Sequence, residues 1–137
     1  MSEPATQIAI AVVERDGYFL VGERPAGKPL AGDAEFPGGR VEAGETPEVA
    51  AVRECMEETG LSIAIVGSYD DRLHEYAHDR LHLHFFACRI VGAVEEPRKP
   101  FRWVSRRDLR MLKFPEANRS LVRLLRAEND SSYPLTE

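Results

Sequence analysis

The stretch "GGRVEAGETPEVAAVRECMEETGL", residues 38–61, contains six glutamates within one predicted helix and the loop before it. Thr46 and Pro47 predict the start of that helix, because threonine is a favourable cap and proline is tolerated in the first turn. Gly60 predicts its end, since glycine commonly follows the last helical turn. Residues at helical spacing are expected to form its packed face: Val49, Val52, Cys55, Met56 and Thr59.

Three of the glutamates, Glu54, Glu57 and Glu58, are three and four residues apart. They are therefore expected on one side of the helix, opposite Val52 and Met56. Carboxylates this close repel one another unless a cation lies among them, and Mg²⁺ prefers such oxygen ligands. A solvated helix face is the plainer interpretation of a run of charges.

Gly38 and Gly39 belong to a short extended piece, "EFPGGRVE", ahead of the helix. Without side chains they allow the backbone to approach the glutamates closely, and a carbonyl there offers a further oxygen ligand. The loop and the helix together therefore favour a metal site over a merely solvated surface.

The spacing of these residues resembles the Nudix box of Nudix hydrolases. That box consists of G, five residues, E, seven residues and then R-E-U-x-E-E-x-G-U, where U is a bulky aliphatic residue. Here Gly39, Glu45 and "RECMEETGL" at residues 53–61 occupy its fixed positions. Cys55 is the one departure, at a position that is usually aliphatic. Because cysteine often behaves as a small buried hydrophobe, this departure concerns packing and not chemistry.

The resemblance implies an α+β fold in which a mixed β-sheet is sandwiched between helices (α/β/α). It implies hydrolysis of a nucleoside diphosphate linked to another group, with Mg²⁺ or Mn²⁺ as cofactor. Carried over by position, the metal would be held by Glu54, Glu57, Glu58 and the Gly38 carbonyl.

Other positions of the box acquire roles in the same way. Arg53, counted with the catalytic residues, and Glu45 would form a pair that fixes the loop against the helix, while Gly39 and Gly60 would be structural. A metal-activated water needs a proton acceptor, and Glu54 is the expected one. Glu95 and Glu96, ahead of the predicted strand "FRWV", are alternative metal ligands or bases, or else part of an exposed acidic loop.

Three further features are similar to the MutT-type subgroup, which hydrolyses nucleoside triphosphates. "EFPGGRVE" includes Phe36, Arg24 precedes it by twelve residues, and "FPEAN" ends at Asn118. The resemblance implies that Arg24 reaches the phosphates and that Asn118 recognises the base. Arg24 is equally compatible with an exposed strand end.

Asn118 also suits an oxidised base on chemical grounds. Guanine presents two acceptors, N7 and O6, along its major-groove edge, and one amide cannot pair with both. In 8-oxoguanine N7 carries a hydrogen, so that edge becomes a donor and an acceptor, which an asparagine amide complements. The alternative is a helix cap, for which asparagine is favoured.

The remaining chain predicts one domain, residues 1–128, followed by a loose tail at 129–137. Strands are expected at Thr6–Val13, "YFLV", Leu61–Tyr69, Leu81–Val91 and "FRWV", with a hairpin turn at Arg15–Gly17 and a closing amphipathic helix at Pro115–Glu128. Trp103 is expected in the core, with base stacking as the lesser alternative. His82 and His84 alternate with leucines, so they share a strand face. They form either a metal pair lacking a third ligand or a solvent-facing or cleft-lining pair.

Composition narrows the partners. Hydrophobic residues make up 43% and charged residues 30%, with a net charge of −5, which argues against stable binding to nucleic-acid backbones. The basic segment between Arg98 and Lys113 is a solvated surface or a phosphate-facing patch. No apolar run predicts a membrane span or signal peptide, and Cys55 and Cys88 form no metal or disulfide pattern, so a cytoplasmic protein is expected.

The sequence therefore predicts a Mg²⁺-dependent nucleoside triphosphate pyrophosphohydrolase that sanitises oxidised guanine nucleotides such as 8-oxo-dGTP, releasing a nucleoside monophosphate and pyrophosphate. Two alternatives stay open. One is the same chemistry on a cytidine nucleotide or ADP-ribose, and the other is a catalytically silent domain that binds nucleotides. The oligomeric state is left open.

Overall fold

The computed structural model describes residues 4–75, 79–93 and 95–127; the predicted tail at 129–137 and residue 128 lie outside these ranges. The elements, in chain order, are β1 (Thr6–Arg15), β2 (Tyr18–Glu23), β3 (Ala34–Glu35), β4 (Gly38–Arg40), α1 (Pro47–Thr59), β5 (Ile63–Ser68), β6 (Arg72–Glu75), β7 (Arg80–Ile90), β8 (Arg102–Ser105), the 3₁₀ helices η1 (Arg107–Met111) and η2 (Glu116–Asn118), and α2 (Arg119–Ala127).

The strands form one mixed sheet with β1 at its centre. Its main path runs β3-β2-β1-β7-β5, with β4 paired to β1, β6 to β7 and β8 to β2. β1 runs parallel to β7, with Thr6 opposite Leu81 and Val13 opposite Cys88, whereas its pairings with β2 and β4 are antiparallel. The predicted α+β class and mixed sheet are therefore confirmed.

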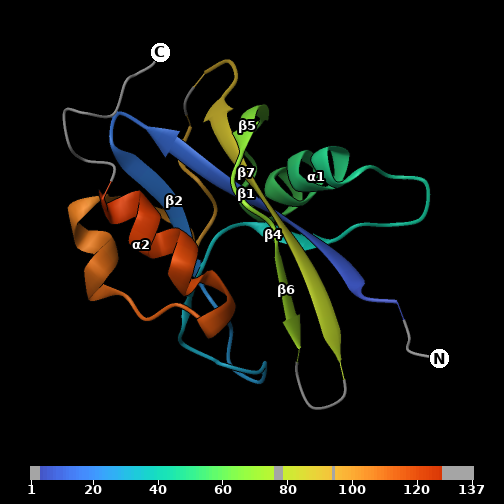
Figure 1. The fold of residues 1–137 in the computed structure, drawn as a ribbon. Coiled ribbons are helices and arrows are strands. Elements are labelled where there is room, and N and C mark those ends of the chain that lie inside the picture. Colours follow the sequence, from blue (N-terminus) through green and yellow to red (C-terminus); the bar gives the residue numbers. More distant parts are fainter. Residues whose placement is uncertain (1–3, 76–78, 94, 128–137) are drawn as a thin grey trace.

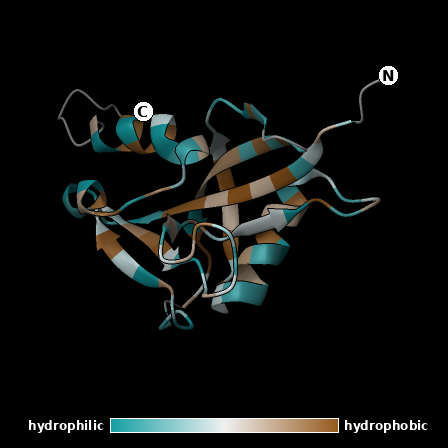
Figure 2. Ribbon diagram, turned by 90° about the horizontal axis from the view of Figure 1, so that it is seen from below, coloured by the Kyte–Doolittle hydropathy of each residue, from teal (hydrophilic) through white to brown (hydrophobic). Residues whose placement is uncertain are grey.

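The sheet lies between the two helices, α1 on one face and α2 on the other (Figure 1). Alternate residues of β1 supply both cores, because successive side chains of a strand point to opposite faces. Ile10 and Val12 belong to the core beneath α2, while Ala9, Ala11 and Val13 belong to the core beneath α1. The hydropathic colouring shows both helices with hydrophilic bands on the outside (Figure 2).

Most predicted elements are confirmed, including the β1–β2 hairpin and the 46–60 helix. Thr46 Oγ1 accepts a hydrogen bond from the Val49 backbone N–H at 3.2 Å, and Gly60 ends α1 in the left-handed region with φ 81°. The closing helix is shorter than predicted, since its first turn is the 3₁₀ helix η2. β6 and η1 were not predicted.

The predicted packed face of α1 is partly wrong. Val49 and Met56 are exposed, at 54% and 40%. The buried residues of the helix are Ala50, Ala51, Cys55 and Thr59. The two alanines meet Ala9 and Ala11 of β1 in one core, and these small side chains allow the helix to lie close to the sheet. Cys55 is fully buried there, as its aliphatic-like position requires.

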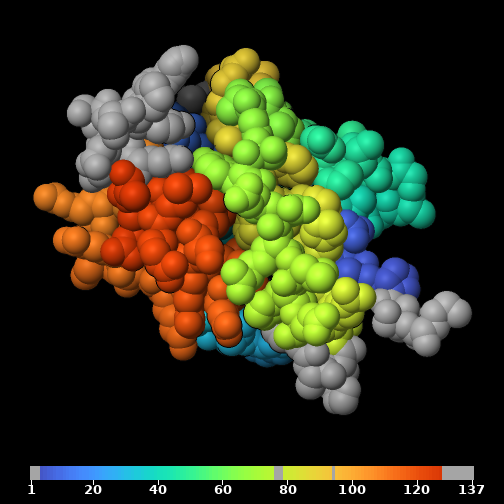
Figure 3. Space-filling model, viewed as in Figure 1, coloured from blue at the N-terminus to red at the C-terminus, as the bar shows by residue number. Residues whose placement is uncertain are grey.

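On the face shown in Figure 3, α2 lies beside the β5–β6 segment. The Arg72 guanidinium donates to Ser120 Oγ across this junction at 3.4 Å. Trp103, predicted in the core, is only partly buried; it packs against the α1-side core and lies beneath the Arg15 guanidinium at 5.7 Å. In the described ranges, no helix has the length and apolarity needed to cross a membrane.

Candidate active site

The predicted metal site lies where α1 faces β4. A Cβ added at Gly39 would lie 2.4 Å from Glu54 Cδ, and one added at Gly38 would lie 2.5 Å from the Ala9 carbonyl oxygen. The Gly38 backbone N–H donates to Glu58 Oε1 at 3.1 Å. Glycine is therefore required at both positions, because any side chain there would clash with Glu54 or with the backbone of β1. The helix α1 directs Glu54 and Glu58 toward β4 and not away from the sheet.

Glu58 lies in an environment that disfavours its charge. Burial, followed by the neighbouring Glu54 and Glu35 carboxylates, raises the pKa of Glu58 to about 8, although the Gly38 N–H acts in the opposite direction. Carboxylates crowded in this way against a loop with no side chains are an oxygen-rich donor set, so the residues present fit a hard divalent cation such as Mg²⁺.

Glu57, the third predicted ligand, is directed elsewhere. Its side chain is 58% exposed, and its Oε1 lies 3.2 Å from the Arg53 guanidinium. Among the residues that the structure describes, the three glutamates do not bring their ligand atoms within 4.8 Å of one another.

Arg53 links the loop to the helix. Its Nε lies 2.5 Å from Glu45 Oε2, its Nη2 donates to Glu45 Oε1 and the Arg40 carbonyl at 3.0 Å each, and its Nη1 lies 3.1 Å from Glu54 Oε2. The guanidinium, followed by the Glu42 backbone N–H, lowers the pKa of Glu45 to about 2. Arg53 and Glu45 thus form a two-pronged ion pair between the 41–46 loop and α1.

A cleft of about 880 Å³ adjoins this site on the other side of β4. Its lining includes every predicted substrate residue together with both glycines: Arg24, Phe36, Gly38, Gly39 and Asn118. Sequence reasoning missed four charged residues of the lining, Lys28, Glu35, Arg40 and Asp79. Glu35 had a usable signal, because it directly precedes Phe36 in the quoted "EFPGG".

Arg24 lies just past the end of β2 and lines the cleft. Its Nε donates to the Pro29 carbonyl at 2.8 Å, and its Nη1 lies 3.3 Å from Glu35 Oε1. Burial raises the pKa of Glu35, while Arg24 and Lys28 act to lower it. The cationic side of the cleft therefore already has a partial counter-charge.

Phe36 and Asn118 also line the cleft. Phe36 is buried and stacks on Phe114 with ring centroids 5.0 Å apart. Asn118 ends η2 and is only 9% exposed. In the described part of the chain its side-chain amide has no hydrogen-bond partner, and none from the first turn of α2 in particular, which is the partner that a helix cap would have.

The region before β8 contributes to the end of α1. Glu95 and Glu96 are exposed, whereas the Arg98 guanidinium donates to the Glu57 carbonyl at 2.6 Å. A cation here compensates the free carbonyls of the helix terminus. The described lining of the cleft includes none of the basic residues between Arg98 and Lys113, so they do not form a phosphate-facing patch there.

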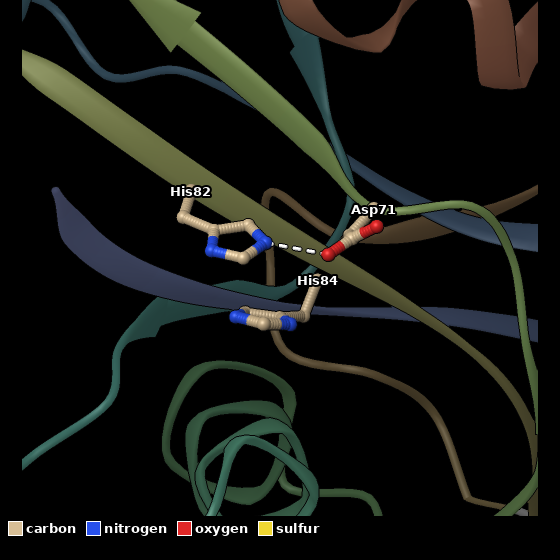
Figure 4. A group of neighbouring side chains, drawn as sticks. All are labelled: Asp71, His82 and His84. Atoms are coloured by element: carbon tan, nitrogen blue, oxygen red, sulfur yellow. Dashed lines mark hydrogen bonds and ion pairs between the residues drawn. The ribbon is translucent and has the colours of Figure 1, made fainter.

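The two histidines of β7 have a third neighbour that the sequence did not indicate. Asp71, just before β6, accepts a hydrogen bond from His82 Nε2 at 2.5 Å, and the His82 and His84 rings stack with centroids 4.2 Å apart (Figure 4). This trio lies outside the glutamate site and the cleft.

Comparison with known proteins agrees with this geometry. The NUDIX domain model matches residues 8–124. The 8-oxo-dGTP diphosphatase of Escherichia coli (strain K12) is 32% identical over 126 residues, covering 88% of this chain and 95% of that protein. The CTP pyrophosphohydrolase of the same organism is 42% identical over 79 residues, covering 57% and 58%. The solution structure of the E. coli ORF135 protein superimposes with a TM-score of 0.77 at 26% identity, covering 96% and 95%. The chain is therefore a member of the Nudix family of hydrolases.

Proposed function

We propose that this enzyme hydrolyses nucleoside triphosphates to a nucleoside monophosphate and pyrophosphate, with an oxidised guanine nucleotide such as 8-oxo-dGTP as the preferred substrate. One observation supports this best. A single cleft joins the glycines of the Nudix box to Asn118, a residue only 9% exposed whose side-chain amide has no hydrogen-bond partner among the described residues. A nucleotide in it would present its phosphates to Gly38 and Gly39 and its base to Asn118.

The metal of the family would be Mg²⁺ or Mn²⁺, held by Glu54, Glu57, Glu58 and the Gly38 carbonyl. Such an ion supplies charge neutralisation on the pyrophosphate and makes a water a better nucleophile. Glu54 and Glu58 lie beside Gly39 and Gly38 respectively, which supports their assignment.

The protein's own residues would then manage the proton and the leaving group. Water oxygen forms a bond to phosphorus, the phosphoanhydride bond to the departing group breaks, and the proton of the water passes to a carboxylate. Glu54 is the proposed acceptor, because it contacts the Gly39 backbone at the cleft. Arg53 holds Glu54 and Glu57 by hydrogen bonds and acts as a positioning residue.

Base recognition is proposed to occur at Asn118, in the same cleft. Asn118 would accept from N7–H and donate to O6 of 8-oxoguanine. Phe36, backed by Phe114, offers an apolar wall, and Arg24 with Lys28 offers positive charge for the triphosphate. The Arg24–Glu35 pair would have to exchange or share its partner when a phosphate binds.

A cytidine nucleotide is the second candidate, because the CTP pyrophosphohydrolase of E. coli is 42% identical over the shared 79 residues. Incubation with 8-oxo-dGTP, dGTP, CTP, dCTP and ADP-ribose in Mg²⁺, with pyrophosphate and monophosphates quantified, separates the candidates. The proposal expects the highest kcat/KM for 8-oxo-dGTP. A higher value for CTP would replace it, and no turnover of any nucleotide would refute the hydrolytic assignment.

We infer a cytoplasmic location, where a nucleotide pool has to be kept free of oxidised bases. Cys55 and Cys88 are both buried free thiols, which suits a reducing compartment.

A further inference from the structure

Asp71, His82 and His84 are brought together by the register of β6 and β7. His82 and His84 are two residues apart on β7, so both project from one face of the sheet. The pairing of Arg72 with Leu83 places Asp71, one residue before β6, opposite His84. Ligand atoms of the three residues all lie within 4.8 Å of one another. In the described ranges, this is the only such group of histidine, cysteine and carboxylate side chains.

We propose that Asp71, His82 and His84 form a second metal site, which binds Zn²⁺ or a transition-metal ion of similar preference. Two imidazoles and one carboxylate are a donor set that suits such ions, whereas Mg²⁺ prefers oxygen alone. This site does not depend on the proposed nucleotide chemistry, and its ion differs in kind from the one expected at Glu54 and Glu58.

The spacing suits a tetrahedral ion. Metal–ligand bonds of about 2.0–2.2 Å place neighbouring donor atoms roughly 3.4 Å apart. The present separations, from 2.5 Å between His82 and Asp71 to at most 4.8 Å within the group, lie on either side of that value. The Asp71 side chain is 58% exposed and free to rotate, while the histidines are held on a strand. A small movement of Asp71 therefore completes the site, with the ion replacing the proton now shared with His82.

Gln7 fixes the tautomer of His84, so that one ring nitrogen is available to a metal. His84 Nε2 lies 2.6 Å from Gln7 Oε1, and Gln7 Nε2 donates to the Ala5 carbonyl at 3.4 Å. Oε1 is thus an acceptor, which places the histidine proton on Nε2 and leaves the Nδ1 lone pair for a metal.

The sheet separates this site from the nucleotide cleft. Leu81 and Leu83 line the cleft. Because successive residues of a strand point to opposite faces, His82 and His84 project to the other side, the one covered by α1. Binding at the histidines is therefore expected to leave hydrolysis with Mg²⁺ unchanged.

The test is a titration of the full-length protein with Co²⁺, in excess Mg²⁺ so that the glutamates are occupied. Visible absorption detects tetrahedral Co²⁺, and Zn²⁺ is then added as a competitor. The wild type should bind one equivalent of Co²⁺ with tetrahedral bands that Zn²⁺ abolishes. His82→Ala should lose that equivalent, and the exposed Asp71→Asn should weaken binding at least about tenfold.

His74→Ala is the matched control. His74 pairs with Leu81 across the β6–β7 ladder, so it lies on the cleft side and its loss should leave the Co²⁺ signal intact. Thermal melting without added transition metal checks that each variant is folded. Unchanged Co²⁺ binding in both folded His82→Ala and folded Asp71→Asn, or the absence of tetrahedral bands in the wild type, would overturn the proposal.

Discussion

The two faces of the sheet are packed with side chains of different size, and the candidate chemistry follows that difference. Under α1 the core includes four alanines of β1 and the helix, Ala9, Ala11, Ala50 and Ala51, alongside larger residues such as Phe86 and Phe101. Under α2 it includes four phenylalanines, Phe19, Phe36, Phe85 and Phe114. Small residues let a helix approach β4 closely enough to place carboxylates on glycine backbone, whereas large rings form one wall of a cleft. The α1 face is thus suited to reaction and the α2 face to recognition.

The largest loss of activity is expected from Glu57→Gln, in the carboxylate group of α1. The amide keeps the shape of the side chain but loses the charge that a metal needs. Loss of several kcal/mol of transition-state stabilisation should lower kcat/KM by more than about a hundredfold at millimolar Mg²⁺, effectively abolishing turnover. Pyrophosphate release from the preferred nucleotide measures this.

Glu48→Gln is its matched control, because Glu48 is an exposed glutamate in the first turn of the same helix. It should retain turnover close to the wild type. Activity of Glu57→Gln within a few-fold of the wild type would remove Glu57 from the metal site.

Metal and nucleotide together are expected to contact residues on both faces of the sheet and so to stabilise the fold. Mg²⁺ or Mn²⁺ with a nucleotide binds only the folded protein and should raise its melting temperature. At a concentration one hundred times Kd the expected stabilisation is about 2.7 kcal/mol. Differential scanning fluorimetry in the presence and absence of each ligand measures it, and no shift at millimolar metal would count against the site.

On the α2 side, Asn118→Ala should reduce the preference for 8-oxo-dGTP over dGTP. Two hydrogen bonds to the oxidised base are lost in a buried pocket, at a cost of about 1–3 kcal/mol, or roughly ten- to a hundredfold in relative kcat/KM. Because the glutamates are untouched, hydrolysis of dGTP should persist.

Glu116→Ala provides the comparison for this variant, since Glu116 is an exposed residue of the same η2 turn. Its selectivity should match the wild type. If Asn118→Ala keeps the same ratio of kcat/KM values, or the wild type has no preference, Asn118 does not recognise the base.

The smallest effect is a dependence of stability on pH in the metal-free protein. Glu58 has a pKa of about 8 when folded against an ordinary value of 4.5, so ionisation disfavours the folded state. The stability that protonated Glu58 contributes to the folded state is complete below pH 4.5 and is lost as the pH rises toward 8. Glu58→Gln should flatten urea-unfolding midpoints across this window, measured with a chelator present.

Glu45, in the loop before the same helix, is expected to give a pH dependence of stability of the opposite sign. Its pKa of about 2 lies below its ordinary value of 4.5, so its contribution is present above pH 4.5 and lost as the pH falls toward 2. Glu45→Gln should therefore lower the unfolding midpoint above pH 4.5 and flatten its decline between pH 4.5 and 2. If the unfolding midpoint of Glu58→Gln varies between pH 4.5 and 8 as much as that of the wild type, Glu58 is not buried as the structure has it.

Local patterns predicted much of this molecule. The cap and the terminal glycine of α1 follow from single residues. The box spacing predicted three carboxylates facing Gly38 and Gly39, of which the structure places Glu54 and Glu58 there and directs Glu57 to Arg53. The prediction of the packed face of α1 was wrong because it relied on the apolar character of Val49 and Met56. In the structure the small side chains of Ala50 and Ala51 pack on the sheet, since they allow the helix to approach it closely. Asp71 was missed because its position opposite His84 depends on the pairing of two strands. Such long-range register leaves no signal in either segment alone.

The parallel pairing of β1 with β7 has a consequence for synthesis. Val13 pairs with Cys88, so the partner of this central strand emerges from the ribosome 75 residues later (88 − 13 = 75). At about 5–20 residues per second, β1 waits roughly 4–15 seconds before its long-range partner exists. During that interval its apolar residues can associate with β2, β4 and α1, which precede β7 in the chain, but not with the parallel partner strand itself. A nascent chain that stops before β7 should therefore stay protease-sensitive, however complete its Nudix box.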